Sequence, residues 1–223
     1  MSPRLMTTPN ANPRTALASF PRSGNTWVRL LLEKAVGQLC GSIYKDRIMP
    51  RTGDGLAIKT HALDSKNYDR AIHILRNPFD VIESYYHWKL NVAEQKNVDW
   101  NEHVRSTAGQ WREHTEHWLN VRYSTHRARY EDLKTRTADE LAKMVTWLGY
   151  EAKPEQITLA VEEGQIDKMR ESHGDLGKKF FRRGEVGKSL NSFTPEQLAF
   201  VNTELRVYLD QFGYTDAAFT QAR

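Results

Sequence analysis

The chain has 223 residues and carries 32 lysines and arginines against 28 aspartates and glutamates, which gives a net charge of +4. This length suits one domain with a sizeable core, and the small basic excess fits an anionic ligand without pointing to nucleic acid. The single cysteine, Cys40, excludes an internal disulfide. No apolar run approaches the roughly 18 residues that a membrane span needs. We therefore expect a cytoplasmic protein that does not bind membranes. The charge alone does not exclude nucleic acid, although no nucleic-acid partner is expected.

The domain limits are predicted from composition. Residues 1–13 lack the apolar core of a signal peptide and are expected to form a flexible tail. Residues 14–214 are expected to form one domain, followed by a short tail at 215–223. Within the domain, residues 162–192 contain five glycines and several lysines and arginines but no sustained apolar period, which is typical of a mobile lid.

Strands and helices are predicted to alternate along the domain. Apolar runs predict strands at 17–20, 55–60 and 71–75, and a weaker pattern, crowded by basic residues, predicts one at 123–130. Helices are predicted at about 26–39, 78–91 and 100–119, and two more begin at capping-box sequences, 137–140 and 194–197, and end at Gly149 and Gly213. This order favours an α/β fold, a mostly parallel central sheet flanked by helices, with ligands at the carboxyl ends of the strands.

The first predicted strand is followed by Pro21-Arg-Ser-Gly-Asn-Thr-Trp27, where a loop leads directly into a helix. Gly24 permits a tight turn, and the unpaired N–H groups of the helix N-terminus then point at the loop. Four side chains there can hydrogen-bond phosphate or sulfate oxygens, namely Arg22, Ser23, Asn25 and Thr26. A Walker A loop needs a second glycine followed by lysine, which this loop lacks. The sequence therefore predicts a P-loop-like oxyanion site that differs from ordinary P-loop NTPases.

A second candidate anion site follows the third predicted strand. Arg76 extends from the end of that strand and Ser84 lies on the second turn of the next helix, so both could reach one anion. The structural alternative is a salt bridge between Arg76 and Asp80, with Ser84 packed against the sheet. The spacing alone leaves both possibilities open.

Four segments, in this order, resemble sulfotransferases that use 3′-phosphoadenosine 5′-phosphosulfate (PAPS). The loop 21–27 is similar to the family's 5′-phosphosulfate loop, and Arg76 and Ser84 have the spacing with which the family grips the 3′-phosphate. Ile58-Lys-Thr-His-Ala62 matches the Lys-Thr/Ser-His segment, whose histidine takes the proton from the acceptor hydroxyl. Phe180-Phe-Arg-Arg-Gly184 begins a stretch similar to the family's C-terminal Arg-Lys-Gly segment, which also grips the 3′-phosphate.

This resemblance implies a PAPS-dependent sulfotransferase whose product is adenosine 3′,5′-bisphosphate (PAP) and which needs no metal. It implies His61 as general base, with Lys59 and Arg22 neutralising charge on the transferring group. Arg22 stands where most cytosolic relatives have lysine, and it is expected to act as a bidentate clamp and not as a general acid. The implied donor-binding residues are Arg22, Ser23, Gly24, Asn25, Thr26, Trp27, Arg76, Ser84, Tyr130, Phe181, Arg182, Arg183 and Gly184. Trp27 could stack on the adenine or pack the first helix on the sheet.

A finer resemblance is to the sulfotransferase domain of WSC-domain-containing proteins, carried by residues 19–27, Gly41-Ser-Ile-Tyr-Lys-Asp46, residues 58–61 and Tyr130-Glu-Asp-Leu133. Those relatives are membrane-anchored and linked to glycan acceptors, whereas this chain shows neither an anchor nor a WSC domain. The acceptor of those relatives does not carry over to this chain, for which a hydroxyl or amine of a small molecule or carbohydrate is expected. Leu190, Pro195 and Ala199 break the dimer motif of many cytosolic members, which leaves the oligomeric state open.

Two other functions fit parts of the sequence. A nucleotide or sugar kinase would need a Mg²⁺-binding carboxylate, for which Asp46, Asp54 and Asp80 are candidates, and a Walker lysine, which is missing. A non-catalytic basic module that binds anions would need no His61, and its binding should weaken steeply with salt whatever the nucleotide.

Overall fold

The centre of the computed structural model is a parallel sheet, and the residues described are 13–182 and 184–214. Its strands are β1 Thr15–Ser19, β2 Gly41–Ser42, β3 Ile58–Thr60, β4 Arg70–Leu75 and β5 Thr125–Arg129. Within the described residues these five strands form one sheet in the order β2-β3-β1-β4-β5. Every pairing between them is parallel, which confirms the predicted α/β fold.

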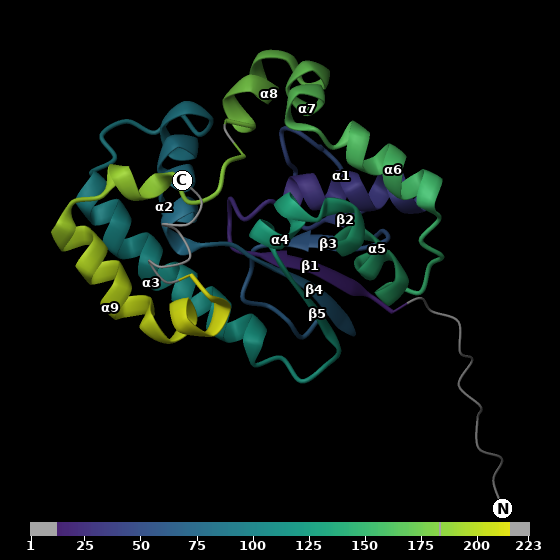
Figure 1. The fold of residues 1–223 in the computed structure, drawn as a ribbon, viewed down its shortest axis with the longest axis horizontal. Coiled ribbons are helices and arrows are strands. Elements are labelled where there is room, and N and C mark those ends of the chain that lie inside the picture. Colours follow the sequence, from purple (N-terminus) through teal and green to yellow (C-terminus); the bar gives the residue numbers. More distant parts are fainter. Residues whose placement is uncertain (1–12, 183, 215–223) are drawn as a thin grey trace, which may run out of the picture.

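Helices flank this sheet in two groups (Figure 1). One group consists of α1 (Asn25–Val36), α4 (Tyr130–Thr135), α5 (Thr137–Trp147) and α6 (Pro154–Glu163), and the other of α2 (Pro78–Asn91), α3 (Trp100–Leu119) and α9 (Pro195–Phe212). Two short helices, α7 (Ile166–Ser172) and α8 (Gly174–Phe180), pack on each other and lie between the groups at the top of the view. A one-turn helix, η1 (Ser189–Ser192), leads into α9.

The core follows the alternation of side chains along β1, which is buried over its whole length. Leu17 joins an apolar cluster with α1, α5 and α6, whereas Ala16 and Ala18 join another with Trp118 of α3. Successive strand side chains point to opposite faces, so this strand ties the two layers together. A separate cluster fills the space between α2, α3 and α9. The sheet thereby holds the carboxyl ends of β1, β3 and β4 next to one another.

Several predicted element bounds are confirmed. Helices α2 and α3 begin and end where the sequence places them. The capping box before α9 is present, because the Thr194 hydroxyl accepts from the Gln197 N–H (3.3 Å) and the Gln197 side chain accepts from the Thr194 N–H (2.9 Å). The capping box predicted at 137–140 is wrong. Thr137 is already helical and its hydroxyl donates to the Leu133 carbonyl (2.7 Å), since α4 directly precedes α5.

Other parts of the fold are absent from the sequence predictions. The patterns do not predict β2, α4 or α6, and the segment 162–192, predicted as a lid, contains α7, α8 and η1. The predicted tails, 1–13 and 215–223, lie almost wholly outside the described residues. Among the helices that the structure describes, none combines the length and the apolar character needed to cross a membrane.

Candidate functional site

A cavity of about 630 Å³ opens at the carboxyl ends of β1, β3 and β4. The sequence-predicted residues that line it are Arg22, Gly24, Asn25, Thr26, Trp27, Lys59, His61, Arg76, Ser84, Tyr130, Phe181, Arg182 and Gly184. Ser23 is buried within the same loop, and Arg183 lies outside the described residues. The fold therefore gathers into one cavity segments that are more than a hundred residues apart in the chain.

The loop between β1 and α1 is shaped around Gly24. Its φ of +96° lies in the left-handed region, and a Cβ atom there would come within 2.6 Å of the Tyr130 ring. Gly24 is also the N-cap of α1 and supplies no side-chain cap, so the helix N-terminus keeps donors for a ligand. Asn25 fastens the helix to β1 by donating to the Leu17 carbonyl (2.9 Å). The buried hydroxyl of Ser23 has no hydrogen-bond partner among the described residues.

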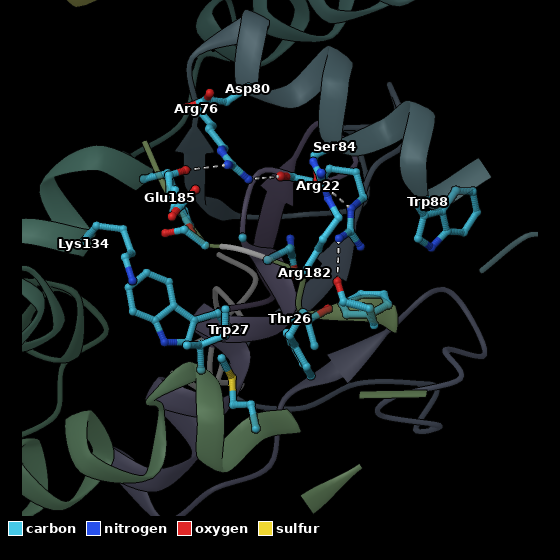
Figure 2. A pocket seen from close by; sticks show the side chains of 18 of the residues that line it. Arg22, Thr26, Trp27, Arg76, Asp80, Ser84, Trp88, Lys134, Arg182 and Glu185 are labelled. Atoms are coloured by element: carbon cyan, nitrogen blue, oxygen red, sulfur yellow. Dashed lines mark hydrogen bonds between the residues drawn. The ribbon is translucent and has the colours of Figure 1, made fainter. Parts of the chain in front are cut away.

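Arginine side chains converge beside this loop (Figure 2). Arg22 donates to the Ser84 hydroxyl (3.3 Å) and to the Phe180 carbonyl (2.8 Å), and Arg76 donates to the carbonyls of Arg22 (2.9 Å) and Glu185 (3.2 Å). Burial lowers the pKa of the Arg22 guanidinium to about 9, and the nearby positive charges add to this effect. Within the described structure, the hydrogen-bond acceptors of these two guanidinium groups are uncharged, which favours binding of an anion.

The predicted alternative for Arg76, a salt bridge to Asp80, is wrong. Asp80 accepts instead from the Gly187 N–H (2.9 Å) and the Ser189 hydroxyl (2.6 Å), which hold down the chain before α9. The Arg76 guanidinium lies 4.2 Å from the centroid of the Tyr130 ring, and its buried Nε has no partner in the described part of the chain. Arg76 is thus oriented by a ring and by carbonyls.

Arg182 differs from the other two arginines because it already has a carboxylate partner. Its guanidinium pairs with Glu83 of α2 (2.8 Å). Its backbone carbonyl, and that of Phe181 (2.7 Å), accept from the Arg170 side chain of α7. The α7 helix therefore holds the segment that carries Arg182 against the cavity.

Lys59 and His61 lie at the end of β3. Lys59 pairs with Asp46 (2.8 Å), and burial lowers the pKa of its ammonium group while Asp46 opposes this shift. His61 donates through Nδ1 to the Ser19 carbonyl (2.6 Å), because a carbonyl can only accept. Burial, followed by the charge of Lys59, lowers the pKa of His61 to about 4. The imidazole is therefore neutral at pH 7, with its lone pair on Nε2.

Trp27 joins the first helix to α6 and to Tyr130. Its indole N–H donates to the Gly164 carbonyl at the end of α6 (2.9 Å), and its ring meets that of Tyr130 edge to face, with centroids 5.7 Å apart. It also lines the cavity, together with Lys134, whose Nζ lies 5.5 Å from the centroid of the Trp27 ring. Figure 2 shows Trp27 and Trp88 on opposite sides of the arginines.

Sequence reasoning misses part of the lining. The missed residues include Tyr44, Tyr85, Trp88, Lys134, Met169 and Phe180. Two signals could have found some of them. Lys134 follows Tyr130 by four residues on α4, and Trp88 follows Ser84 by four residues on α2, so helical spacing brings each pair toward the same cavity.

The carboxylates considered for a kinase have other partners. Asp46 pairs with Lys59, Asp54 pairs with Arg14 (3.1 Å), and Asp80 binds the chain before α9. The described residues contain no group of three or more His, Cys, Asp or Glu side chains that could hold a metal ion.

Comparison with known sequences places these features in a family. The family model described as “Sulfotransferase domain” matches residues 56–213. The chain is 28% identical to WSCD family member CG9164 of Drosophila melanogaster and 30% identical to WSCD family member GA21586 of Drosophila pseudoobscura pseudoobscura, in each case over 89% of this chain. It spans 66% of the length of each of those relatives. It is also 26% identical to the 3-beta-hydroxysteroid sulfotransferase of Cavia porcellus, over 82% of this chain and 79% of that protein.

Solved structures share the fold. Mouse sulfotransferase SULT7A1, crystallised with PAP, has a TM-score of 0.71 at 19% identity, over 92% of this chain and 90% of that one. Retinol dehydratase, crystallised with androsterone and the inactive cofactor PAP, has a TM-score of 0.66 at 15% identity, over 88% of this chain and 80% of that one. Together with the family match, these likenesses bear out the resemblance seen in the sequence. The chain belongs to the sulfotransferase domain family.

Proposed function

We propose that this protein transfers a sulfuryl group from PAPS to a hydroxyl or amine of a small-molecule or carbohydrate acceptor. Family membership supports sulfuryl transfer in general. The observation that carries the finer proposal is the juxtaposition in one cavity of an uncapped helix N-terminus, two guanidinium groups without carboxylate partners among the described residues, and the neutral His61.

The cavity fits a donor with two phosphate groups. The buried Ser23 hydroxyl and the Arg76 Nε lack partners in the described structure, and unpartnered buried polar groups are costly unless a ligand satisfies them. Arg22 and Arg76 donate to carbonyl oxygens, which a phosphate or sulfate oxygen could replace. The PAP complexes of SULT7A1 and retinol dehydratase support the same nucleotide for this chain.

We assign the donor's parts to separate residues. The 5′-phosphosulfate would lie against the loop at 22–26 and the N-terminus of α1. The 3′-phosphate would meet Arg76, Ser84 and Arg182, with Gly184 beside them and with Arg183, which lies outside the described residues. The adenine would lie by Trp27, Tyr130 and Phe181. Bound there, the donor supplies the sulfuryl group for transfer.

The acceptor's proton is assigned to His61. Since Nδ1 donates to the Ser19 carbonyl, Nε2 is the basic atom, and the low pKa keeps it unprotonated at pH 7. Lys59 and Arg22 neutralise the negative charge that develops on the sulfuryl oxygens. A guanidinium whose pKa is about 9 stays charged at pH 7, so Arg22 acts as a clamp and not as an acid.

The domain limits are part of the proposal. Residues 14–214 form the sulfotransferase domain, and residues 162–192 form a lid over the donor. The lid is supported by its contacts, because the Phe180 and Glu185 carbonyls occupy Arg22 and Arg76. Donor binding would exchange these contacts for phosphate contacts.

A nucleotide panel tests the donor assignment. We expect PAP to raise the melting temperature far more than AMP, ATP or GTP do, and PAP at about 100 times its dissociation constant should add roughly 2.7 kcal/mol of stability. Sulfuryl transfer from radiolabelled PAPS to phenols, sterols, amines and free sugars then tests the reaction and finds the acceptor class. Equal stabilisation by PAP and AMP would overturn the 3′-phosphate assignment, and preferential stabilisation by ATP would revive the kinase hypothesis.

A further inference from the structure

The chain after β2 runs beside the end of β3. Ser42 pairs with Lys59 in the sheet, and the N–H of Ile43 donates to the Lys59 carbonyl (3.1 Å). Ser42 is also joined to Gly53 by two backbone hydrogen bonds of 3.1 and 3.0 Å. A Cβ atom on Gly41 would come within 1.9 Å of the Gly53 carbonyl oxygen, so the two backbones pack too closely for a side chain at position 41. The residues that follow Ser42 therefore start from a fixed point.

Side chains alternate along this continuation. Ile43 and Lys45 are exposed, whereas Tyr44 and Asp46 are partly buried and line the cavity. The two inward residues are separated by one position, as are Lys59 and His61 on the neighbouring segment. Because inward side chains occupy every second position on both segments, Tyr44 can contact His61 and Asp46 can contact Lys59.

Tyr44 contacts His61 through both ring and hydroxyl. The backbone N–H of His61 donates to the Tyr44 hydroxyl (3.1 Å), and the two rings stack with centroids 5.5 Å apart and planes at 23°. Ser19 holds the Nδ1 edge of the imidazole. The ring is thus confined on one face and one edge, and Nε2 takes part in neither contact.

Asp46 contacts Lys59 through charge. Its Oδ1 accepts from the Lys59 ammonium (2.8 Å) and its Oδ2 from the Arg29 guanidinium (2.9 Å). The side chains of Arg29, Lys59 and Asp46 are 0%, 7% and 18% exposed, so these charges interact with little solvent screening. Asp46 alone would cancel the charge of Lys59. With Arg29 on the other oxygen, the three groups sum to one positive charge beside the cavity, which Lys59 and Asp46 line.

We propose that Tyr44 and Asp46 are positioning residues for sulfuryl transfer: Tyr44 fixes the imidazole of His61, and Asp46, anchored by Arg29, fixes the ammonium of Lys59. This inference rests on the function proposed above, because it assigns both residues to act through the catalytic groups named there. The proposal adds the segment after β2, which carries Tyr44 and Asp46, to the end of the cavity that already holds Lys59 and His61.

Asp46→Asn tests the charge while keeping the shape. We expect the turnover number to fall at least about tenfold, with the dissociation constant for PAP changed by less than about threefold. The charged groups that face Lys59 are Asp46, Arg29 and Arg22, with the Tyr44 ring beside them, and among these Asp46 carries the negative charge. The alkaline limb of the turnover profile should therefore move to lower pH in Asp46→Asn.

Tyr44→Phe tests the hydroxyl, since it keeps the stacked ring and removes the acceptor of the His61 backbone N–H. We expect turnover to fall about three- to tenfold, with PAP affinity and the alkaline limb unchanged. Lys45→Ala is the matched control, because Lys45 lies between the two residues and is exposed. It should leave turnover and melting temperature as in the parent protein.

A double-mutant cycle separates a positioning role from a structural one. If Asp46 acts through Lys59, Asp46→Asn adds little to the loss caused by Lys59→Ala, whereas a structural role would add its full effect. Should Asp46→Asn fail to fold because Arg29 keeps a buried charge, Arg29→Met with Asp46→Asn removes both charges and should show the same loss of turnover. Parent-like turnover in a folded Asp46→Asn protein, or full additivity, overturns the inference. Parent-like turnover in Lys59→Ala and His61→Ala overturns the proposed catalytic roles instead.

Discussion

The two ends of the cavity hold their charged side chains by different kinds of contact. At the ends of β1 and β4, Arg22 and Arg76 donate to backbone carbonyl oxygens. At the end of β3, Lys59 is paired with a carboxylate that a buried arginine also grips. A carbonyl carries no net charge and gives way to a phosphate or sulfate oxygen, whereas the ion pair keeps its place. The comparison indicates that anion binding and proton transfer can be altered separately.

Of the changes considered, His61→Ala should lower turnover the most while leaving PAP binding intact. The described contacts of His61 are with Ser19 and Tyr44 and not with the arginines, so PAP affinity should stay near that of the parent. Turnover should fall about 10²–10⁴-fold, as expected on loss of a general base. Steady-state rates together with calorimetric titration of PAP measure the two quantities. A variant that keeps its maximal rate and loses PAP affinity would show that His61 is a binding residue.

Arg76→Ala should break the binding end alone. A hydrogen bond to a charged group contributes about 1.5–3 kcal/mol, so PAP should bind about 10- to 150-fold more weakly. AMP, which lacks the 3′-phosphate, should lose much less affinity, and turnover at saturating PAPS should stay close to the parent value. Arg206→Ala is the control, because Arg206 is 74% exposed and pairs with Asp210 on α9. An equal loss for AMP and PAP would contradict the 3′-phosphate assignment.

Mild acid should lower the stability of the fold that carries both ends of the cavity, while His61, the proposed general base, stays neutral. His73 on β4 is fully buried, and burial lowers its pKa from 6.5 to about 3. As the pH falls, His73 takes up a proton in the unfolded chain before it does so in the folded protein. The contribution of its burial to the free energy of unfolding is therefore fully present above pH 6.5 and is lost as the pH drops toward 3. At pH 5 the loss from His73 should be about 2 kcal/mol, whereas His61, with a pKa of about 4, stays mostly neutral.

Urea unfolding of the parent and of His73→Met at pH 7 and pH 5 measures this effect. The variant should lose less stability between the two pH values, because it lacks the titrating imidazole. Identical losses in the two proteins would show that other groups cause the acid sensitivity.

Chelation should have the smallest effect. The positive charge at both ends of the cavity is assigned to Arg22, Lys59 and the N-terminus of α1, so sulfuryl transfer should continue unchanged in excess EDTA. Loss of activity in chelator, with recovery on adding Mg²⁺, would mean that a metal supplies part of this charge.

The predictability of the fold depends on the length of its elements. Helices α2, α3 and α9 have long apolar stripes or caps that single-sequence patterns detect. The two residues of β2 are too few for a period, and they form a strand because their backbone packs between β3 and Gly53. The box at Thr137 misleads because its motif is local, while the hydroxyl's partner, Leu133, belongs to the helix before it.

The parts of the candidate site that could be predicted are those whose residues lie close together in the sequence. The phosphate loop, the Lys59-Thr-His61 segment and the pair Arg76 and Ser84 could each be identified in this way, and all of them line the cavity. The partners of those residues could not. Whether Arg76 meets Asp80 or a carbonyl, and whether Tyr44 meets His61, depends on the register of strands and loops far apart in sequence.

The carbonyls of Phe180 and Glu185 have a consequence for affinity. Because they occupy Arg22 and Arg76, they act as an intramolecular competitor of any anion that binds there. The apparent dissociation constant of such a ligand is its intrinsic value divided by the fraction of molecules in which these arginines are released. Changes that weaken the contacts of the Phe180 and Glu185 carbonyls should therefore tighten nucleotide binding without altering any contact to the ligand. If these carbonyls leave the arginines slowly, that step would set the rate at which the anion binds.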